Sequence, residues 1–171
     1  MPVVVEGSAR QWFGAMALAC FAAVGAALIA QYGYDMRPCP WCILQRLIFV
    51  VIGVLALVGA LARSPMVRRI LAADTLLLAL LAGAAALYQH FVAAASTSCN
   101  LTLADRIVGG LRLDTALPAL FGVTASCADA AVDVFGIPFE FWSLALAGLL
   151  GVGAARILLR SEGLRRRPAG P

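Results

Sequence analysis

Charged residues are scarce in this chain of 171 residues, and lysine is absent altogether. Only 13% of the residues are charged, against about 25% in soluble globular domains, while 63% are hydrophobic and the mean hydropathy is +0.93. The sequence also lacks internal repeats and low-complexity tracts. The low content of charged residues and the high content of hydrophobic ones exclude an ordinary soluble domain.

The apolar residues come in long, unbroken runs and not in an amphipathic alternation. About 20 residues at a helical rise of 1.5 Å span the ~30 Å hydrocarbon core of a bilayer. Four runs are long enough, at about residues 12–30, 43–62, 70–91 and 139–159. The sequence therefore predicts an all-α membrane protein, a bundle of four transmembrane helices that forms a single membrane domain over residues 1–171.

All 13 basic residues apart from the one histidine are arginines, and their positions predict the orientation of the bundle. Nine of them fall on one side of a four-span arrangement: Arg10, Arg63, Arg68, Arg69, Arg156, Arg160, Arg165, Arg166 and Arg167. Cytoplasmic loops carry an excess of basic residues. We therefore expect both termini in the cytoplasm, with outer loops at residues 31–42 and 92–138. The net charge of +4 reflects this topology and gives no support for nucleic-acid binding.

The second outer loop is the only long stretch without a spanning run. Loops of more than about 15 residues in a compact protein are usually functional or disordered. This loop contains Cys99 and Cys127, and its middle, residues 111–121, mixes apolar and small residues. That pattern is compatible with a short helix lying flat on the membrane surface.

Four of the five cysteines fall on the outer side of the predicted topology: Cys39, Cys42, Cys99 and Cys127. The fifth, Cys20, lies inside the first span and is most simply a small apolar packing residue. Because the outer side of a bacterial-type membrane is oxidising, we expect two disulfides, Cys39–Cys42 at the membrane surface and Cys99–Cys127 in the loop. Structural staples, a redox relay and a zinc site compete as interpretations. Zinc is the weakest, since four-cysteine sites favour two Cys-x-x-Cys knuckles and one is present.

The surroundings of the motif Cys39-Pro40-Trp41-Cys42 favour the redox interpretation. If a helix begins at the motif, Pro40 suits its first position and Cys42 falls in the first turn, near the positive end of the helix dipole. Arg46 follows one turn later on the same face. A helix N-terminus and a guanidinium both favour thiolate over thiol, which predicts a stabilised thiolate at the membrane boundary. The competing interpretation of Arg46 is an interfacial arginine whose head reaches water.

Taken together, these features resemble the DsbB family of inner-membrane disulfide-bond-formation proteins. The resemblance covers nearly the whole chain and includes four spans, two cysteines in the second outer loop, and Cys-x-x-Cys followed by Ile43-Leu44-Gln45-Arg46. The segment Phe135-Gly136-Ile137-Pro138-Phe139, with Trp142, also looks like the family at the start of its fourth span. The resemblance implies a protein dithiol:quinone oxidoreductase in the bacterial inner membrane. Such an enzyme reoxidises a DsbA-like periplasmic thioredoxin-fold oxidase and passes the electrons to membrane quinone.

The resemblance also implies a role for each outer cysteine. Cys99 would be the sulfur attacked by the partner's thiolate, and Cys127 would complete the loop pair and exchange with Cys39. Cys42 would be the thiolate that contacts the quinone, either ubiquinone or menaquinone. No metal is implied, and the expected partners are the soluble oxidase, the quinone pool and the lipid bilayer.

Three further residues follow from the same resemblance. Arg46 would stabilise the Cys42 thiolate and a quinone oxygen. His90, the only histidine, matches the family's histidine at the end of the third span in kind. His90 would be a hydrogen-bond donor to a quinone oxygen or a proton route, since histidine titrates in the right range for proton transfer. The alternative is an ordinary interfacial hydrogen-bonding residue. Gln45 stands where some members carry an acidic residue.

Three other interpretations compete with a quinone-dependent oxidase. A vitamin K epoxide reductase-like protein is also a small helical bundle with Cys-x-x-Cys, but that family places the motif after the loop cysteines, and here the order is reversed. A DsbB paralogue dedicated to one partner fits the sequence equally well. A non-enzymatic membrane scaffold stapled by two disulfides predicts that Arg46→Ala has no effect.

Overall fold

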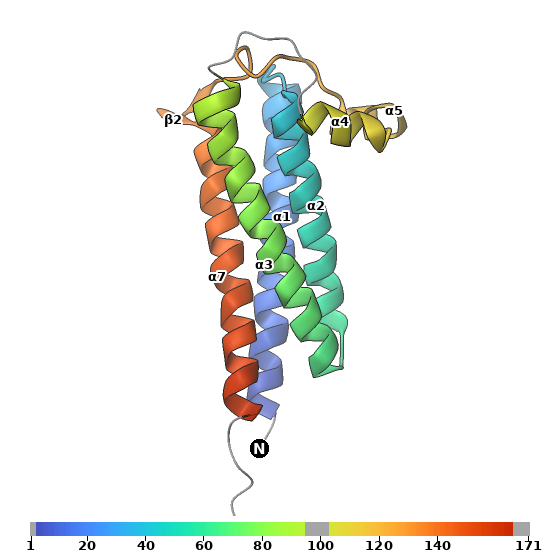
Figure 1. Ribbon diagram of the computed structural model, residues 1–171, viewed down its shortest axis with the longest axis vertical. Coiled ribbons are helices and arrows are strands. Elements are labelled where there is room, and N and C mark those ends of the chain that lie inside the picture. Colours follow the sequence, from blue (N-terminus) through green and yellow to red (C-terminus); the bar gives the residue numbers. More distant parts are fainter. Residues whose placement is uncertain (1–2, 95–102, 166–171) are drawn as a thin grey trace, which may run out of the picture.

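Four long helices packed side by side dominate the computed structural model, which describes residues 3–94 and 103–165 (Figure 1). They are α1 (Val3–Gly33), α2 (Pro40–Leu61), α3 (Pro65–Tyr88) and α7 (Phe139–Arg165). Among the described residues, four segments are long and apolar enough to cross a membrane: Ala9–Gly33, Pro40–Leu61, Pro65–Ala93 and Phe139–Arg160. The third continues beyond α3 to Ala93. The predicted bundle of four membrane-spanning helices is confirmed.

The second and third helices begin earlier than the apolar runs that predicted them. They start at Pro40 and Pro65, where the sequence predicted residues 43 and 70. Proline is well suited to a first helical position because its missing N–H has no intrahelical partner there. Helix bounds taken from apolar runs omit a first turn that contains polar residues, as at the start of α3. Arg68 in this turn donates a hydrogen bond from Nε to the Ala62 carbonyl at 2.9 Å.

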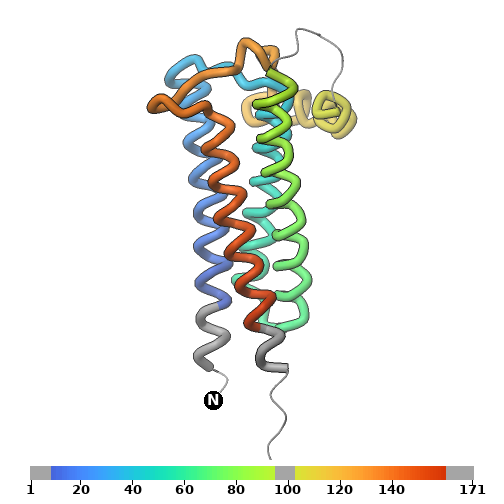
Figure 2. The backbone as a smooth tube through the Cα atoms, turned by 60° about the vertical axis from the view of Figure 1, so that its left-hand side comes forward, coloured from blue at the N-terminus to red at the C-terminus, as the bar shows by residue number. Residues whose placement is uncertain are grey.

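The four helices form a closed ring. α1 packs against α2, α2 against α3 and α3 against α7, while α7 returns to contact α1. Figure 2 shows the bundle from a second direction, with the blue end of α1 and the red end of α7 at the same end of the bundle. Its interior is an apolar cluster that includes Phe13, Met16, Cys20, Phe49, Ile52 and Leu150. Cys20 is fully buried in this cluster, as its predicted packing role requires.

Glycines allow close approach at three points in this interior. A Cβ atom on Gly59 would lie 2.8 Å from the ring of Phe13, and one on Gly153 would lie 3.0 Å from the sulfur of Met16. A Cβ on Gly53 would meet the ring of Phe21 at 3.0 Å. Small residues at these positions bring helix backbones together, which is how membrane helices gain packing contacts where no water is expelled.

The segment between α3 and α7 folds at the other end of the bundle and contains several short elements. These are a π-helical turn η1 (Gln89–Ala93), α4 (Leu103–Gly110), α5 (Leu113–Ala116), α6 (Pro118–Phe121), β1 (Asp133–Val134) and β2 (Ile137–Pro138). The two strands pair as an antiparallel hairpin, with Val134 opposite Ile137. Phe135 and Gly136 between them have φ values of 56° and 75°, the positive values that a tight two-residue hairpin turn requires.

A short helix does lie across the direction of the bundle, as predicted, but it is α4 and not residues 111–121 (Figure 1). The predicted stretch forms two single turns, α5 and α6, instead of one helix. Two local features interrupt it. Arg112 adopts the left-handed conformation with φ 52°, and Pro118 begins α6.

Candidate functional site

Cys39 and Cys42 lie together at the start of α2. Cys39 is the N-cap residue, and its sulfur accepts a hydrogen bond from the backbone N–H of Cys42 at 3.3 Å. The two sulfurs are 2.9 Å apart, and Cys39 is fully buried. Pro40 takes the first helical position, as the sequence predicted. The helix start therefore holds two free thiols in contact.

Cys127 is brought to the same place by the loop that precedes β1. Its thiol lies near that of Cys39 and interacts with it, and both side chains belong to a small apolar cluster that includes Trp41. The loop is anchored there because the backbone N–H groups of Thr124 and Ala125 donate to the Pro38 carbonyl at 3.1 and 3.3 Å. The structure thus brings together three of the four predicted catalytic cysteines. The fourth, Cys99, lies outside the described residues.

The interaction between the thiols of Cys39 and Cys127 shifts their pKa values in opposite directions. It is the largest cause that raises the pKa of Cys39 above the ordinary value, and the contact with Cys42 and burial raise it further. The same interaction lowers the pKa of Cys127. Cys127 is therefore the more readily ionised sulfur of the pair, which makes it the better leaving group in thiol–disulfide exchange.

Gln89, which sequence reasoning missed, contacts the sulfur of Cys42. Its side-chain Nε2 donates to Cys42 Sγ at 3.2 Å, and its Oε1 accepts a hydrogen bond from Gln45 Nε2 at 2.7 Å. Both glutamines are only 3% exposed. A polar residue beside His90 in an otherwise apolar span was a signal that could have identified Gln89, because polar groups inside membrane spans are usually functional.

Arg46 is 6% exposed and lies inside the end of the bundle. Its Nη1 donates to Gln31 Oε1 at 2.9 Å and to the Leu120 carbonyl at 2.7 Å, which ties α2 to α1 and α6. Its Nε is buried and has no hydrogen-bond partner among the described residues. This burial contradicts the interpretation of Arg46 as an interfacial arginine that reaches water. The guanidinium is close enough to Cys42 to interact with it electrostatically.

His90 contacts a carboxylate that the sequence analysis did not predict. His90 Nδ1 lies 2.6 Å from Glu140 Oε1, in the first turn of α7. Glu140 is 4% exposed, and its Oε2 is buried without a hydrogen-bond partner in the described part of the chain. Glu140 could have been identified from the sequence as an acidic residue at the start of an apolar run, because charged groups in membrane spans are usually functional.

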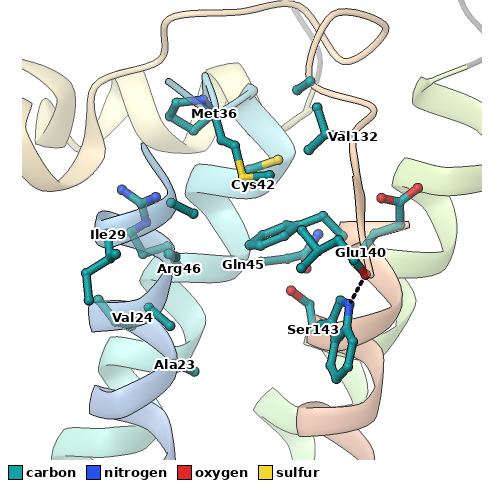
Figure 3. Close-up of a pocket in the computed structure, with 18 of the residues that line it drawn as sticks. Ala23, Val24, Ile29, Met36, Cys42, Gln45, Arg46, Val132, Glu140 and Ser143 are labelled. Atoms are coloured by element: carbon teal, nitrogen blue, oxygen red, sulfur yellow. Dashed lines mark hydrogen bonds between the residues drawn. The ribbon is translucent and has the colours of Figure 1, made fainter. Parts of the chain in front are cut away.

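A cavity of about 740 Å³ lies between α1, α2, α7 and the loops at this end of the bundle. Figure 3 shows Cys42, Gln45 and Arg46 on the wall formed by α2, with Glu140 and Ser143 on the facing wall formed by α7. Most of the remaining lining is apolar and includes Val24 and Ile29 of α1. His90 is not among the described residues that line the cavity, but its partner Glu140 is. The arrangement can hold an apolar ligand with its polar atoms beside the Cys42 sulfur.

Comparisons with known proteins agree with this arrangement. The family profile described as "Disulfide bond formation protein DsbB" matches residues 9–157. Disulfide bond formation protein B 1 of Pseudomonas syringae pv. syringae is 35% identical over 156 residues, which cover 90% of this chain and 89% of the relative. Disulfide bond formation protein B of Burkholderia thailandensis is 34% identical over 88% of this chain and 90% of its own length.

A third relative, Disulfide bond formation protein B of Cupriavidus necator, is 30% identical over 92% of this chain and 98% of its own length. No solved structure matches the chain at a significant level. The family profile and the relatives each cover most of the chain, and the four apolar helices and clustered cysteines fit a membrane protein that forms disulfide bonds. This chain therefore belongs to the DsbB family of disulfide bond formation proteins.

Proposed function

We propose that this protein is a protein dithiol:quinone oxidoreductase of the bacterial inner membrane that reoxidises a DsbA-type partner on the periplasmic side. One observation carries the proposal: Cys42 lines a largely apolar cavity of about 740 Å³ and also contacts Cys39, which contacts Cys127. A chain of sulfurs thus leads from the loop to a cavity within the bundle. Such a chain suits the transfer of electrons from a soluble dithiol to an acceptor dissolved in the membrane.

The cavity fits a quinone, either ubiquinone or menaquinone, as the electron acceptor. Small-molecule sites typically measure about 300–1,000 Å³ and combine apolar walls with a few polar groups. Arg46 lines the cavity and can donate a hydrogen bond to a quinone oxygen, and its buried Nε has no partner among the described residues. Glu140 lines the facing wall and can hold a proton there, and its buried Oε2 has no partner in the described part of the chain. These two buried atoms are the observation that supports a polar ligand at this place, because buried polar groups in proteins are nearly always paired.

The exchange begins at the loop pair. The thiolate of the partner attacks Cys99 of the Cys99–Cys127 disulfide, which forms a mixed disulfide and releases Cys127 as a thiolate. Cys127 then attacks Cys39 of the Cys39–Cys42 disulfide, and Cys42 leaves as a thiolate beside the cavity. The contact between Cys127 and Cys39 supports this step, because no large movement is needed to bring the two sulfurs together.

Two further exchanges complete the cycle. The second thiol of the partner resolves the mixed disulfide, so that the partner leaves oxidised and Cys99 is free to attack Cys127. That attack restores the Cys99–Cys127 disulfide and releases Cys39 as a thiol. Cys39 and Cys42 then lose two electrons and two protons and re-form their disulfide, while the quinone is reduced to the quinol. The contact of His90 with Glu140, which lines the cavity, supports a role for the two residues in proton delivery to the cavity wall.

The experiment that tests the proposal measures anaerobic quinone reduction by the purified protein in the presence of a reduced DsbA-type dithiol. We expect stoichiometric loss of quinone with the wild type and none with Cys42→Ser. Cys20→Ala is the matched control, since Cys20 is buried in the core cluster away from the other described cysteines. If the wild type leaves the quinone oxidised while its partner dithiol stays reduced, the protein is not a quinone-dependent oxidase.

A further inference from the structure

We propose that Gln89 is a catalytic residue whose amide stabilises the thiolate of Cys42, and that Gln45 is the positioning residue that orients this amide. The proposal deepens the proposed function, because it rests on Cys42 being the sulfur that reacts at the cavity. It rests on the hydrogen bonds of two buried side chains from different helices.

The hydrogen bonds run in one direction, from Gln45 through Gln89 to the sulfur. A glutamine amide has a donor end, NH2, and an acceptor end, the carbonyl oxygen. Gln45 Nε2 donates to Gln89 Oε1 at 2.7 Å, so the acceptor end of the Gln89 amide is occupied by Gln45. The donor end is then left facing Cys42 Sγ, at 3.2 Å. Gln45 thus decides which end of Gln89 meets the sulfur.

Burial makes this contact strong. Gln45 and Gln89 are each 3% exposed, so water does not compete for the amide or for the sulfur on this side. A hydrogen bond to an ionised acceptor is roughly twice as strong as one between neutral groups, and a low local dielectric strengthens it further. The donated hydrogen bond therefore favours the thiolate of Cys42 over the thiol.

Gln89 is the first residue of the π-helical turn η1, which ends the third span. Three consecutive residues at the end of the third span contact three different places. Tyr88 stacks on Trp41 of α2 with ring centroids 4.7 Å apart, Gln89 reaches Cys42, and His90 pairs with Glu140 of α7. Single π-helical turns inside α-helices shift the register of the side chains that follow and occur frequently at functional sites.

Several charged or titratable groups also surround Cys42. They are Cys39 before α2, Arg46 on α2, Cys127 in the loop, and Tyr34, Arg37 and Glu140 around the cavity, with His90 behind Glu140. A test of Gln89 must leave all of these in place. Substitution of glutamine by methionine does so, because it keeps the length of the side chain and adds no charge.

The test measures how fast Cys42 is alkylated by iodoacetamide as a function of pH in the reduced full-length protein. Fragment-ion mass spectrometry separates Cys42 from Cys39. For Gln89→Met we expect the midpoint of the Cys42 profile to move upwards by about one pH unit, which is a tenfold slower reaction below the midpoint. Gln45→Met should move it in the same direction by less. Gln11→Met, on the exposed surface of α1, is the matched control and should leave the profile unchanged.

The double variant Gln45→Met/Gln89→Met tests the positioning role. If Gln45 acts through Gln89, the double variant shifts the profile no further than Gln89→Met alone. If Gln89→Met does not fold, Gln89→Glu replaces the donor by an acceptor at nearly the same volume and should also move the midpoint upwards. An unchanged profile in a folded Gln89 variant overturns the proposal, and additive shifts overturn the role of Gln45. Because no quinone takes part, these results are independent of whether the protein reduces quinone.

Discussion

The thiols of Cys127 and Cys39 interact at the start of α2, although Cys127 belongs to the second outer loop and Cys39 to the first. Cys39 in turn lies 2.9 Å from Cys42. The order Cys127, Cys39, Cys42 is the order in which the proposed exchange passes electrons. The structure thus contains the contact that joins the loop to the cavity.

The first prediction concerns the pH dependence of Cys39. Because the interaction with Cys127 is the leading cause that raises the pKa of Cys39, Cys127→Ala should lower that pKa. Cys39 in the reduced variant should therefore be alkylated faster than in the wild type at mildly alkaline pH, and the difference should vanish at high pH, where both are ionised. Mass spectrometry of the alkylated peptide measures the rates. In the converse variant, Cys39→Ala, the pKa of Cys127 should rise. Equal Cys39 rates at every pH would contradict this account.

The second prediction concerns Arg46. Arg46→Gln removes the charge near Cys42 and leaves Gln31 and the Leu120 carbonyl without their donor. We expect kcat/KM for quinone reduction to fall by about 10²–10³-fold, since removal of one preorganised hydrogen-bond donor at a reacting centre costs about 2.7–4 kcal/mol. We also expect a loss of about 1–3 kcal/mol in the free energy of unfolding. Arg10→Gln, on the exposed face of α1, is the control and should change neither quantity. A silent Arg46→Gln would support the scaffold interpretation.

The third prediction separates proton delivery from thiol exchange. Glu140→Gln keeps the shape of the side chain and an oxygen for His90, but it cannot hold a proton at the cavity wall. We expect single-turnover quinone reduction to slow severalfold, whereas exchange between the partner and the cysteine cluster continues at the wild-type rate. Stopped-flow absorbance follows the quinone, and acid trapping follows the disulfides. Asp74→Asn, on the exposed face of α3, is the matched change from carboxylate to amide. If Glu140→Gln slows both steps equally, the residue acts on the fold and not on protons.

The fourth prediction concerns the bundle. A Cβ on Gly59 would lie 2.8 Å from the fully buried ring of Phe13, so Gly59→Ala should overpack the interface between α1 and α2 and cost about 1–3 kcal/mol of unfolding free energy. Gly25→Ala, with nothing within 4 Å of the new Cβ, should be neutral or slightly stabilising. Unfolding in detergent, followed by circular dichroism, compares the two. Phe13→Leu should rescue Gly59→Ala, because it removes the ring that the methyl group meets.

Local sequence determined the helices of this protein. In a bilayer the backbone must satisfy its own hydrogen bonds, so an apolar run of sufficient length has little choice but to form a helix. The start of α2 was equally predictable, because the cap Cys39, the first residue Pro40 and the first-turn Cys42 interact within one turn of chain. The approach of the second loop's cysteine to this pair was implied only by the family resemblance.

Tertiary structure alone decided what surrounds Cys42. The sequence did not predict that Gln89 contacts Cys42, that Glu140 contacts His90 or that Gln31 contacts Arg46. Each of these contacts joins two different helices, and hydropathy indicates the length of a span but not its rotation about its own axis. A rotation of one residue position, about 100°, would turn Gln89 away from the sulfur. Packing contacts between the helices, including the close approaches at glycines, fix the rotation of each span. The sequence by itself thus determined the spans and the cysteine pair at the start of α2, whereas packing between the helices determined the amide, the carboxylate and the arginine contacts around it.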